Sequence, residues 1–177
     1  MKIEILQVGY LETNCYILSI DGKVLIIDPG DEAERIVDLV GNREVLGIIV
    51  THYHDDHIGA LDELEIKYGA KVYDIHNIVD GENTVGCFKF LGIKTPGHKE
   101  DAICIYFPQE KIMFSGDFIF KDTVGRWDLD GGNFNEMKNS IGKIVEYPSD
   151  IIVYPGHGEK TTLGDEKVNL ENIAKYF

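Results

Sequence analysis

The sequence predicts two mixed β-sheets packed face to face, with helices on their outer surfaces. Three observations lead to this fold class. Short β-like runs that end in turn signals recur along the 177 residues. Amphipathic stripes at helical spacing lie between these runs. Hairpin-like pairs come first in each half of the chain and strand–helix alternation follows, which favours mixed sheets over one uniformly parallel sheet.

The expected strands are short and end at glycine, proline or aspartate. Asp21-Gly22 separates two of them and is a strong signal for a hairpin turn, and Pro29-Gly30 closes the second strand of that pair. The expected strands are Ile3–Val8, Cys15–Ile20, Lys23–Asp28, Val45–Val50, Ala70–Ile75, Gly86–Ile93, Ile103–Phe107, Lys111–Ser115 and Ile151–Tyr154.

The expected helices carry apolar residues at spacings of three and four. Asn133, with Glu136 three residues later, predicts a capping box at the start of one of them. These helices are Glu32–Val40, Asp56–Tyr68, Phe134–Tyr147 and Asp165–Tyr176. No linker, low-complexity tract or charge block interrupts the pattern, so we expect a single domain over residues 1–177.

The charge balance restricts the class of partner. Lys and Arg number 17 against 31 Asp and Glu, which gives a net charge of −14 and a pI near 4.7. A broad nucleic-acid surface needs many cations to neutralise phosphates, so we expect no nucleic-acid partner. No apolar run approaches the roughly 18 residues of a membrane span, and the first residues lack a signal-peptide core. We therefore expect no membrane partner and a cytoplasmic protein.

The cysteines of this sequence do not indicate a functional site. Cys15, Cys87 and Cys104 are scattered and form no CxxC pair, which argues against a disulfide framework and against a thiolate zinc site.

Imidazoles and carboxylates are concentrated after the apolar run Val45–Val50. His52 and His54 are two residues apart, so an extended loop points both to the same side. Asp56 and His57 are adjacent and cannot share that direction, which suits a second ion. Histidine nitrogen and carboxylate oxygen are good ligands for divalent metals.

Three later runs repeat this arrangement of strand, small-residue turn and ligand type. They deliver His98, Asp117 and His157, each preceded by a glycine that lets the backbone turn sharply. We therefore expect four loops to converge on a metal site at one edge of the sandwich. His76 lies outside the pattern, and we expect it to have no metal role.

These motifs resemble the signature of the metallo-β-lactamase superfamily, His-x-His-x-Asp-His followed by a distant His, Asp and His. Within the superfamily, Thr95–His98, Phe114–Asp117 and Pro155–Gly158 are similar to the glyoxalase II (hydroxyacylglutathione hydrolase) branch. The resemblance covers most of the chain. It implies a four-layer αββα sandwich of two mixed sheets with the metal site at one edge.

The resemblance also implies a role for each residue of the set. One divalent ion is bound by His52, His54 and His98, the second by Asp56, His57 and His157, and Asp117 bridges both. Asp56 and Asp117 are then the catalytic carboxylates, and Asp28 supports the site from beside it. We expect two ions, zinc before iron or manganese. Metal binding lowers the pKa of water from 15.7 toward about 7, so a hydroxide bridging the ions is the expected nucleophile.

This sequence departs from glyoxalase II in one respect. That branch carries a C-terminal helical extension that binds glutathione, whereas 20 residues follow His157 here. We therefore expect substrate recognition by loops near the metals and only modest activity on hydroxyacyl-glutathione. In Gly125-Arg126-Trp127, Arg126 is the candidate for gripping a substrate carboxylate bidentately.

The interpretation that follows is a binuclear metal-dependent hydrolase acting on a small acyl thioester, since a thiolate leaves readily. Two alternatives stay open at this point. One is a mononuclear-iron persulfide dioxygenase on the same fold, which would leave the second ligand set empty. The other is a non-enzymatic, metal-stabilised binding domain, although closed structural zinc sites are typically four-ligand and single-ion. The sequence leaves the oligomeric state open.

Overall fold

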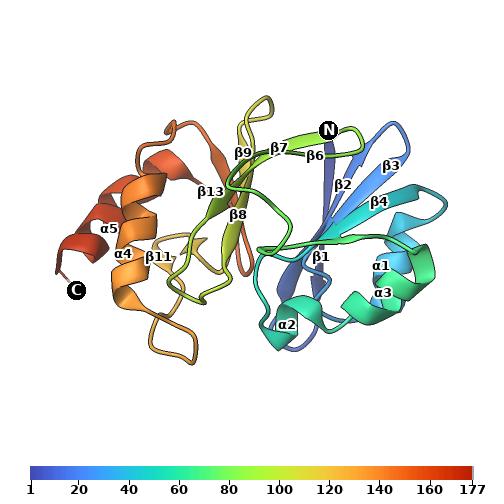
Figure 1. The fold of residues 1–177 in the computed structure, drawn as a ribbon, viewed down its shortest axis with the longest axis horizontal. Coiled ribbons are helices and arrows are strands. Elements are labelled where there is room, and N and C mark those ends of the chain that lie inside the picture. Colours follow the sequence, from blue (N-terminus) through green and yellow to red (C-terminus); the bar gives the residue numbers. More distant parts are fainter. Residues whose placement is uncertain (177) are drawn as a thin grey trace.

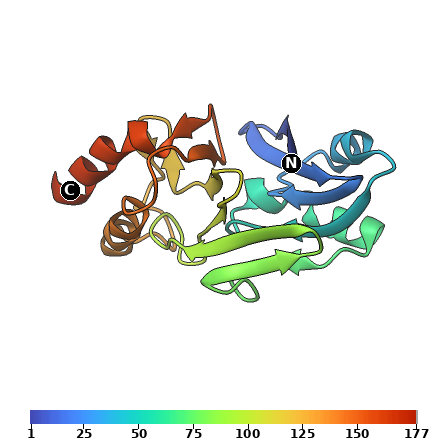
Figure 2. The ribbon, with the colours of Figure 1, turned by 90° about the horizontal axis from the view of Figure 1, so that it is seen from above.

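Two β-sheets lie face to face, and helices cover the outer surface of each (Figure 1). The computed structural model describes residues 1–176. The arrangement confirms the predicted αββα sandwich. In Figure 1 the layers follow one another from α4 and α5 on the left to α1 and α3 on the right, and Figure 2 shows the two sheets from above.

The first sheet contains the N-terminal half of the chain in the order β1-β2-β3-β4-β5. Its first three strands are antiparallel, and β3, β4 and β5 are parallel to one another. The strands are β1 (Lys2–Val8), β2 (Thr13–Ile20), β3 (Lys23–Ile27), β4 (Glu44–Ile49) and β5 (Val72–Tyr73). The helices of this half are α1 (Ala33–Val40), α2 (Asp55–Ile58) and α3 (Leu61–Tyr68).

The second sheet has the order β13-β12-β9-β8-β7-β6, with one parallel pair, β12 and β9. Its strands are β6 (Gly81–Val85), β7 (Phe88–Lys94), β8 (Ile103–Phe107), β9 (Ile112–Gly116), β12 (Ile152–Pro155) and β13 (Thr161–Thr162). Helices α4 (Phe134–Ile144) and α5 (Leu163–Tyr176) cover it, and β10 (Ile119–Phe120) and β11 (Thr123–Val124) form a small hairpin beside it. None of the helices described is long and apolar enough to cross a membrane.

Strand alternation divides the core into three layers. Along β3, Leu25 and Ile27 face the other sheet, while Val24 and Ile26 face α1 and α3. Along β8, Ile105 faces the first sheet and its neighbours pack beneath α4 and α5. Because successive side chains of a strand point to opposite faces, each central strand supplies both the inter-sheet layer and a helix layer. These strands are consequently apolar throughout, as the sequence pattern predicted.

The predicted helix over Asp56–Tyr68 is wrong as one element, because α2 and α3 are separate helices. The break falls at Gly59-Ala60, where the Ala60 N–H donates to the Pro29 carbonyl at 3.0 Å and so leaves the helical pattern. Gly59 also lies so close to Gly30 that a Cβ atom would stand 2.3 Å from the Gly30 carbonyl oxygen. The turn after β3 therefore packs directly against the segment that carries Asp56 and His57.

The predicted cap of α4 forms in part. Asn133 Oδ1 accepts a hydrogen bond from the Glu136 N–H at 3.1 Å. The Asn133 N–H donates to the Gly97 carbonyl at 2.8 Å, so it is not free for the reciprocal bond of a capping box. The start of α4 is thereby tied to the loop that presents His98.

Candidate metal centre

The predicted ligands follow strands whose ends meet at one edge of the sandwich. His52 and His54 follow β4, with Asp56 and His57 on the adjoining α2. His98 follows β7, Asp117 follows β9 and His157 follows β12. The strands β7, β9 and β12 run in the same direction within their sheet, so their loops emerge at the same end.

Three imidazole nitrogens meet at one point. His54 Nδ1 lies 3.0 Å from His52 Nε2 and 3.0 Å from His98 Nε2. Their donor atoms are close enough together to hold one metal ion. The first two residues come from the end of a first-sheet strand and the third from the second sheet, so this donor set joins the two sheets.

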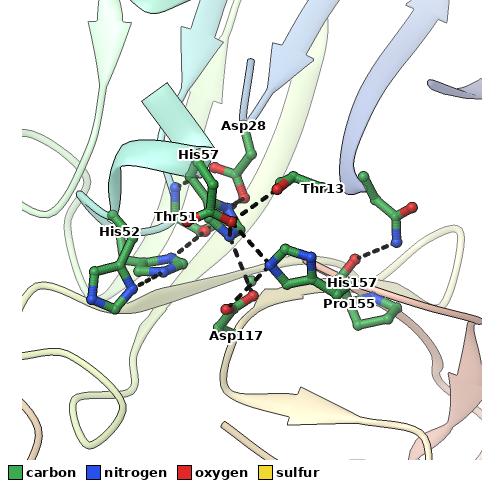
Figure 3. A network of polar contacts seen from close by, with 12 residues as sticks. Thr13, Asp28, Thr51, His52, His57, Asp117, Pro155 and His157 are labelled. Atoms are coloured by element: carbon green, nitrogen blue, oxygen red, sulfur yellow. Dashed lines mark hydrogen bonds and ion pairs between the residues drawn. The ribbon is translucent and has the colours of Figure 1, made fainter. Parts of the chain in front are cut away.

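A second donor set lies beside the first. His157 Nε2 is 3.1 Å from Asp56 Oδ2, and His57 Nε2 is 3.5 Å from the same oxygen. These three residues also form a compact group of potential ligands. In Figure 3, His57 lies above Asp117 and His157 lies to its right.

The Asp117 carboxylate lies between the two sets. Its Oδ1 is 3.3 Å from His57 Nε2, and its Oδ2 is 3.6 Å from His98 Nε2 and 3.5 Å from His157 Nε2. One carboxylate thus faces donors of both sets.

Outer hydrogen bonds orient the rings of both sets. His57 Nδ1 lies 3.0 Å from Asp28 Oδ2, and the Thr51 hydroxyl, 3.2 Å from His52 Nδ1, donates to the same oxygen at 2.7 Å (Figure 3). Since a carboxylate only accepts, His57 carries a proton on Nδ1 and turns Nε2 toward the centre. The Thr51 hydroxyl already uses its hydrogen, so it accepts from His52 Nδ1 and leaves His52 Nε2 free.

Backbone carbonyls orient two more imidazole rings through hydrogen bonds. The Arg126 carbonyl accepts from His98 Nδ1 at 2.6 Å, and the Leu11 carbonyl accepts from His157 Nδ1 at 3.0 Å. Four imidazoles therefore turn Nε2 toward the centre, as metal-ligating histidines held by outer partners do.

The residues fit a divalent metal on their own chemistry. Lone pairs of His52 and His98 point at the same His54 nitrogen, whose single proton could satisfy only one of them. His57 Nε2 and Asp117 Oδ1 are buried and have no hydrogen-bond partner in the part of the chain that the structure describes. Buried polar atoms normally have partners, so this convergence of unpaired acceptors is typical of a cation site.

Electrostatics adjust the protonation of these groups for metal binding. Burial lowers the pKa of His52 well below its usual range, and the neighbouring His57 adds to this effect. Burial and His98 lower the pKa of His54. For Asp117 burial acts in the opposite sense, but the neighbouring His157 and His57 rings outweigh it and lower the carboxyl pKa. His52 and His54 are therefore neutral at neutral pH, and Asp117 is ionised.

Burial also disfavours a charged His57, but the carboxylates of Asp28 and Asp117 outweigh it and raise the pKa of His57 to about 10. In the same way Asp117 and Asp56 raise the pKa of His157 to about 9. A metal ion at this second donor set would therefore replace protons on the two rings.

Glycines permit the close approach of these loops. A Cβ atom at Gly156 would stand 2.1 Å from Asp117 Oδ1 and 2.7 Å from His57 Cε1. Gly116 has φ of +50°, and a Cβ atom there would stand 2.4 Å from Thr51 Oγ1. Any side chain at these positions would displace the candidate ligands.

The centre opens into a cleft of about 950 Å³. Its apolar lining includes Leu11, Phe120 and Leu129. Arg126 also lines it, but its guanidinium is exposed and already forms a bidentate pair with Asp128, at 2.9 and 3.0 Å. The predicted role of Arg126 as a substrate clamp stays a prediction.

His76 lies apart from the centre, exposed on the segment after β5, with its N–H donating to Asp74. Sequence reasoning missed Thr13, whose hydroxyl donates to Asp56 Oδ2 at 2.9 Å, and Thr51 as the link between Asp28 and His52. Thr51 directly precedes His52, so its position was a usable signal. Thr13 is 43 residues from Asp56, and nothing local in the sequence connects them.

Comparison with known proteins identifies the family of this fold and donor set. The family model described as "Metallo-beta-lactamase superfamily" matches residues 8–82 and 77–157. The chain belongs to the metallo-beta-lactamase superfamily. It is accordingly a metallo-hydrolase-type enzyme, and the fold together with its His and Asp clusters implies divalent metal.

Three relatives place this superfamily member more closely. It is 31% identical to the "Hydroxyacylglutathione hydrolase GloC" of Haemophilus influenzae, over 94% of this chain and 95% of that protein. It is similar in structure to ETHE1 from Myxococcus xanthus, with a TM-score of 0.90 and 25% identity over 99% of this chain and 85% of that one. The protein TTHA1623 in a di-iron-bound form has a TM-score of 0.84 and 29% identity, over 92% of this chain and 96% of that one. The first of these likenesses supports the glyoxalase II-like branch.

Proposed function

We propose that this chain is a binuclear metal-dependent hydrolase that cleaves a small acyl thioester. The observation that carries the proposal is the position of Asp117, whose two oxygens lie 3.3–3.6 Å from donors of both sets. A site for a single ion would leave the second donor set, Asp56, His57 and His157, without a function. In the proposal, His52, His54 and His98 would hold one ion, the second donor set would hold the other, and Asp117 would bridge them.

The bound ions would supply Lewis acidity and water of lowered pKa. The chain's own residues position and shield that chemistry. Asp28 and Thr51 keep the His57 and His52 lone pairs aimed at the centre. Leu11 and Phe120 line the cleft with apolar surface, which suits an acyl or thiol chain. Because Asp117 is ionised and faces both donor sets, it offsets part of the charge that two divalent ions bring.

A glutathione thioester is one candidate within this substrate class. The Haemophilus influenzae relative bears the name hydroxyacylglutathione hydrolase and aligns over nearly its full length. A protein of similar extent therefore carries that name, so the expected lack of a C-terminal extension does not by itself argue against glutathione. The proposal accordingly covers glutathione thioesters together with smaller ones.

The proposal is tested by metal content together with a substrate panel. Protein purified without added metal is analysed for zinc, iron and manganese, and then assayed with thioesters of glutathione and of N-acetylcysteamine. We expect about two divalent ions per chain and hydrolysis with release of free thiol. His76→Ala is the matched control and should behave as the unaltered protein. Full metal loading without turnover of any thioester in the panel would refute the proposed hydrolase.

A mononuclear-iron persulfide dioxygenase is the second candidate, and the likeness to ETHE1 from Myxococcus xanthus is the observation that favours it. The same preparation separates the two functions. One iron per chain, with oxygen consumption in the presence of glutathione persulfide, would favour the dioxygenase. Two ions and no oxygen consumption would favour the hydrolase.

A further inference from the structure

The cleft over the metal centre contains two long cationic side chains, Lys99 and Arg126. The two side chains differ in whether another residue already binds their charged group. The Arg126 guanidinium is bound through two hydrogen bonds to Asp128, and both side chains are more than 60% exposed. A substrate carboxylate would have to displace Asp128 in order to use the same fork.

Lys99 stands in a different environment. It directly follows the candidate ligand His98 and is only partly exposed. Within the described residues its ammonium has neither an ion-pair partner nor a hydrogen-bond partner, although Asp55 and Asp130 also line the cleft. The loop that follows β11 passes close to its stem, since a Cβ atom at Gly131 would stand 3.5 Å from Lys99 Cγ.

This placement suits the recognition of an anion. The loop restricts the stem, while the ammonium keeps its hydrogen-bonding capacity for a ligand in the cleft. An ammonium in a partly apolar cleft attracts a carboxylate more strongly than it would in open water, because part of the solvent screening is removed. Lys99 is also adjacent to the candidate metal ligands, which would face the scissile carbonyl. One small molecule can therefore present a carboxylate to Lys99 and its thioester carbonyl to the metal centre.

We propose that Lys99 is a specificity-determining residue that binds a carboxylate of the substrate, so that the enzyme prefers anionic over neutral thioesters. This inference rests on the proposed function. The carboxylate belongs either to the acyl group or to the thiol carrier, and the two sources share the same chemistry at Lys99. Whether the carboxylate lies on the acyl group or on the thiol carrier, its charge strengthens substrate binding, and the same thioester bond is cleaved.

The test compares three thioesters with metal-loaded protein. Succinyl-N-acetylcysteamine carries the charge on the acyl group, the pentanoyl thioester of 3-mercaptopropionate carries it on the thiol, and pentanoyl-N-acetylcysteamine is neutral. For Lys99→Met we expect KM to rise on the order of 10-fold for at least one anionic substrate, as for a partly exposed charge-assisted hydrogen bond. KM for the neutral substrate and kcat for all three should stay unchanged. The anionic substrate that responds identifies the source of the carboxylate.

Two further variants make the comparison specific. Lys99→Arg keeps the positive charge and should recover most of the preference. Lys89→Met removes an equal charge from an exposed position on β7 outside the cleft and should leave every KM unchanged. The preference of the unaltered protein should weaken in 0.5 M salt, since a partly exposed charge is screened.

A binding measurement separates this inference from the proposed function. Calorimetry with succinate and butyrate on the metal-loaded protein should show a preference for succinate that Lys99→Met removes. If no thioester is hydrolysed, the proposed function fails and this ratio still tests Lys99. Butyrate has one carboxylate, which the metal centre can take, whereas succinate has a second one for Lys99. Equal effects of Lys99→Met on succinate and butyrate, or on charged and neutral thioesters, would overturn the assignment, as would no effect on any of them.

Discussion

Replacing Asp28 by Asn tests whether one buried carboxylate sets the protonation of both donor sets. Asp28 is 1% exposed, and its two oxygens accept from the Thr51 N–H, the Thr51 hydroxyl and His57 Nδ1, at 2.7, 2.7 and 3.0 Å. Its φ is +52°, a conformation that Asn tolerates better than most residues. The substitution therefore changes the hydrogen bonding with little strain on the backbone.

Neither orientation of the new amide satisfies all three donors. With its NH₂ toward His57, the ring must move its proton to Nε2, and the lone pair that faces the centre is lost. With its NH₂ toward the Thr51 N–H, two donors face each other in a buried site, which costs about 1–3 kcal/mol. Loss of an outer partner of a ligating histidine typically weakens metal affinity about 10- to 100-fold. We expect a loss of this size, about 1.4–2.8 kcal/mol at 1.4 kcal/mol per tenfold.

The measurement is a competition titration with a metal-binding dye, together with urea unfolding of the metal-free protein. Glu166→Gln is the matched control, because Glu166 is also a buried carboxylate, 2% exposed, but accepts from Thr161 and the Asp122 N–H away from the centre. It should lose stability without losing metal affinity. Unchanged affinity for both ions in Asp28→Asn would show that this carboxylate does not control the ring protonation.

The remaining predictions concern the ligands, a close-packed glycine and the thiols. Asp117→Ala and His54→Ala should each abolish hydrolysis while circular dichroism stays that of the folded protein, since both residues lie in loops; normal metal content and turnover in Asp117→Ala would exclude bridging. Gly156→Ala should reduce metal content and cost about 1–3 kcal/mol of stability in urea unfolding, because its Cβ atom would stand 2.1 Å from Asp117 Oδ1; full metal loading would contradict this. Only exposed Cys87 should react with a thiol reagent in the folded protein, because Cys15 and Cys104 are buried and burial raises the pKa of Cys104 to about 12; all three should react after unfolding, and rapid modification of a second thiol beforehand would show that the core opens.

The sequence predicted the central strands because their signal is local. Runs such as Ile103–Phe107 are apolar at every position and end at turn residues, and both properties are visible in a short window. Strand β6, Gly81–Val85, was missed because its residues are mainly polar and alternate between partly exposed and exposed. It is an edge strand whose pairing with β7 across Gly86-Cys87, rather than its own composition, makes it a strand.

The candidate ligands were predictable for a different reason. Metal chemistry allows few residue types, and the strand–glycine–ligand arrangement repeats at His98, Asp117 and His157. The groups that orient the ligands were harder to predict from the sequence, because backbone carbonyls have no sequence signature. The Leu11 carbonyl lies 146 residues from His157, and the Arg126 carbonyl lies 28 residues from His98. Only the folded chain shows these partners.

The junction between the sheets explains why the donor geometry is held so firmly. The Asn14 N–H donates to the Gly156 carbonyl at 2.7 Å, and the Ile103 N–H donates to the Thr51 carbonyl at 2.9 Å. Each bond joins a residue of one sheet or its loops to the other sheet beside a candidate ligand. The donors are therefore fixed by the same contacts that hold the sandwich together.

The cationic side chains of the cleft, Lys99 and Arg126, extend from loops over the centre. Among residues 1–176, neither side chain forms a hydrogen bond between the sheets. Substitutions there change the charge presented to a substrate without moving the metal ligands. In this chain, chemistry and specificity thus depend on different contacts, which is why changes at Lys99 should alter KM while changes at Asp28 should alter metal affinity.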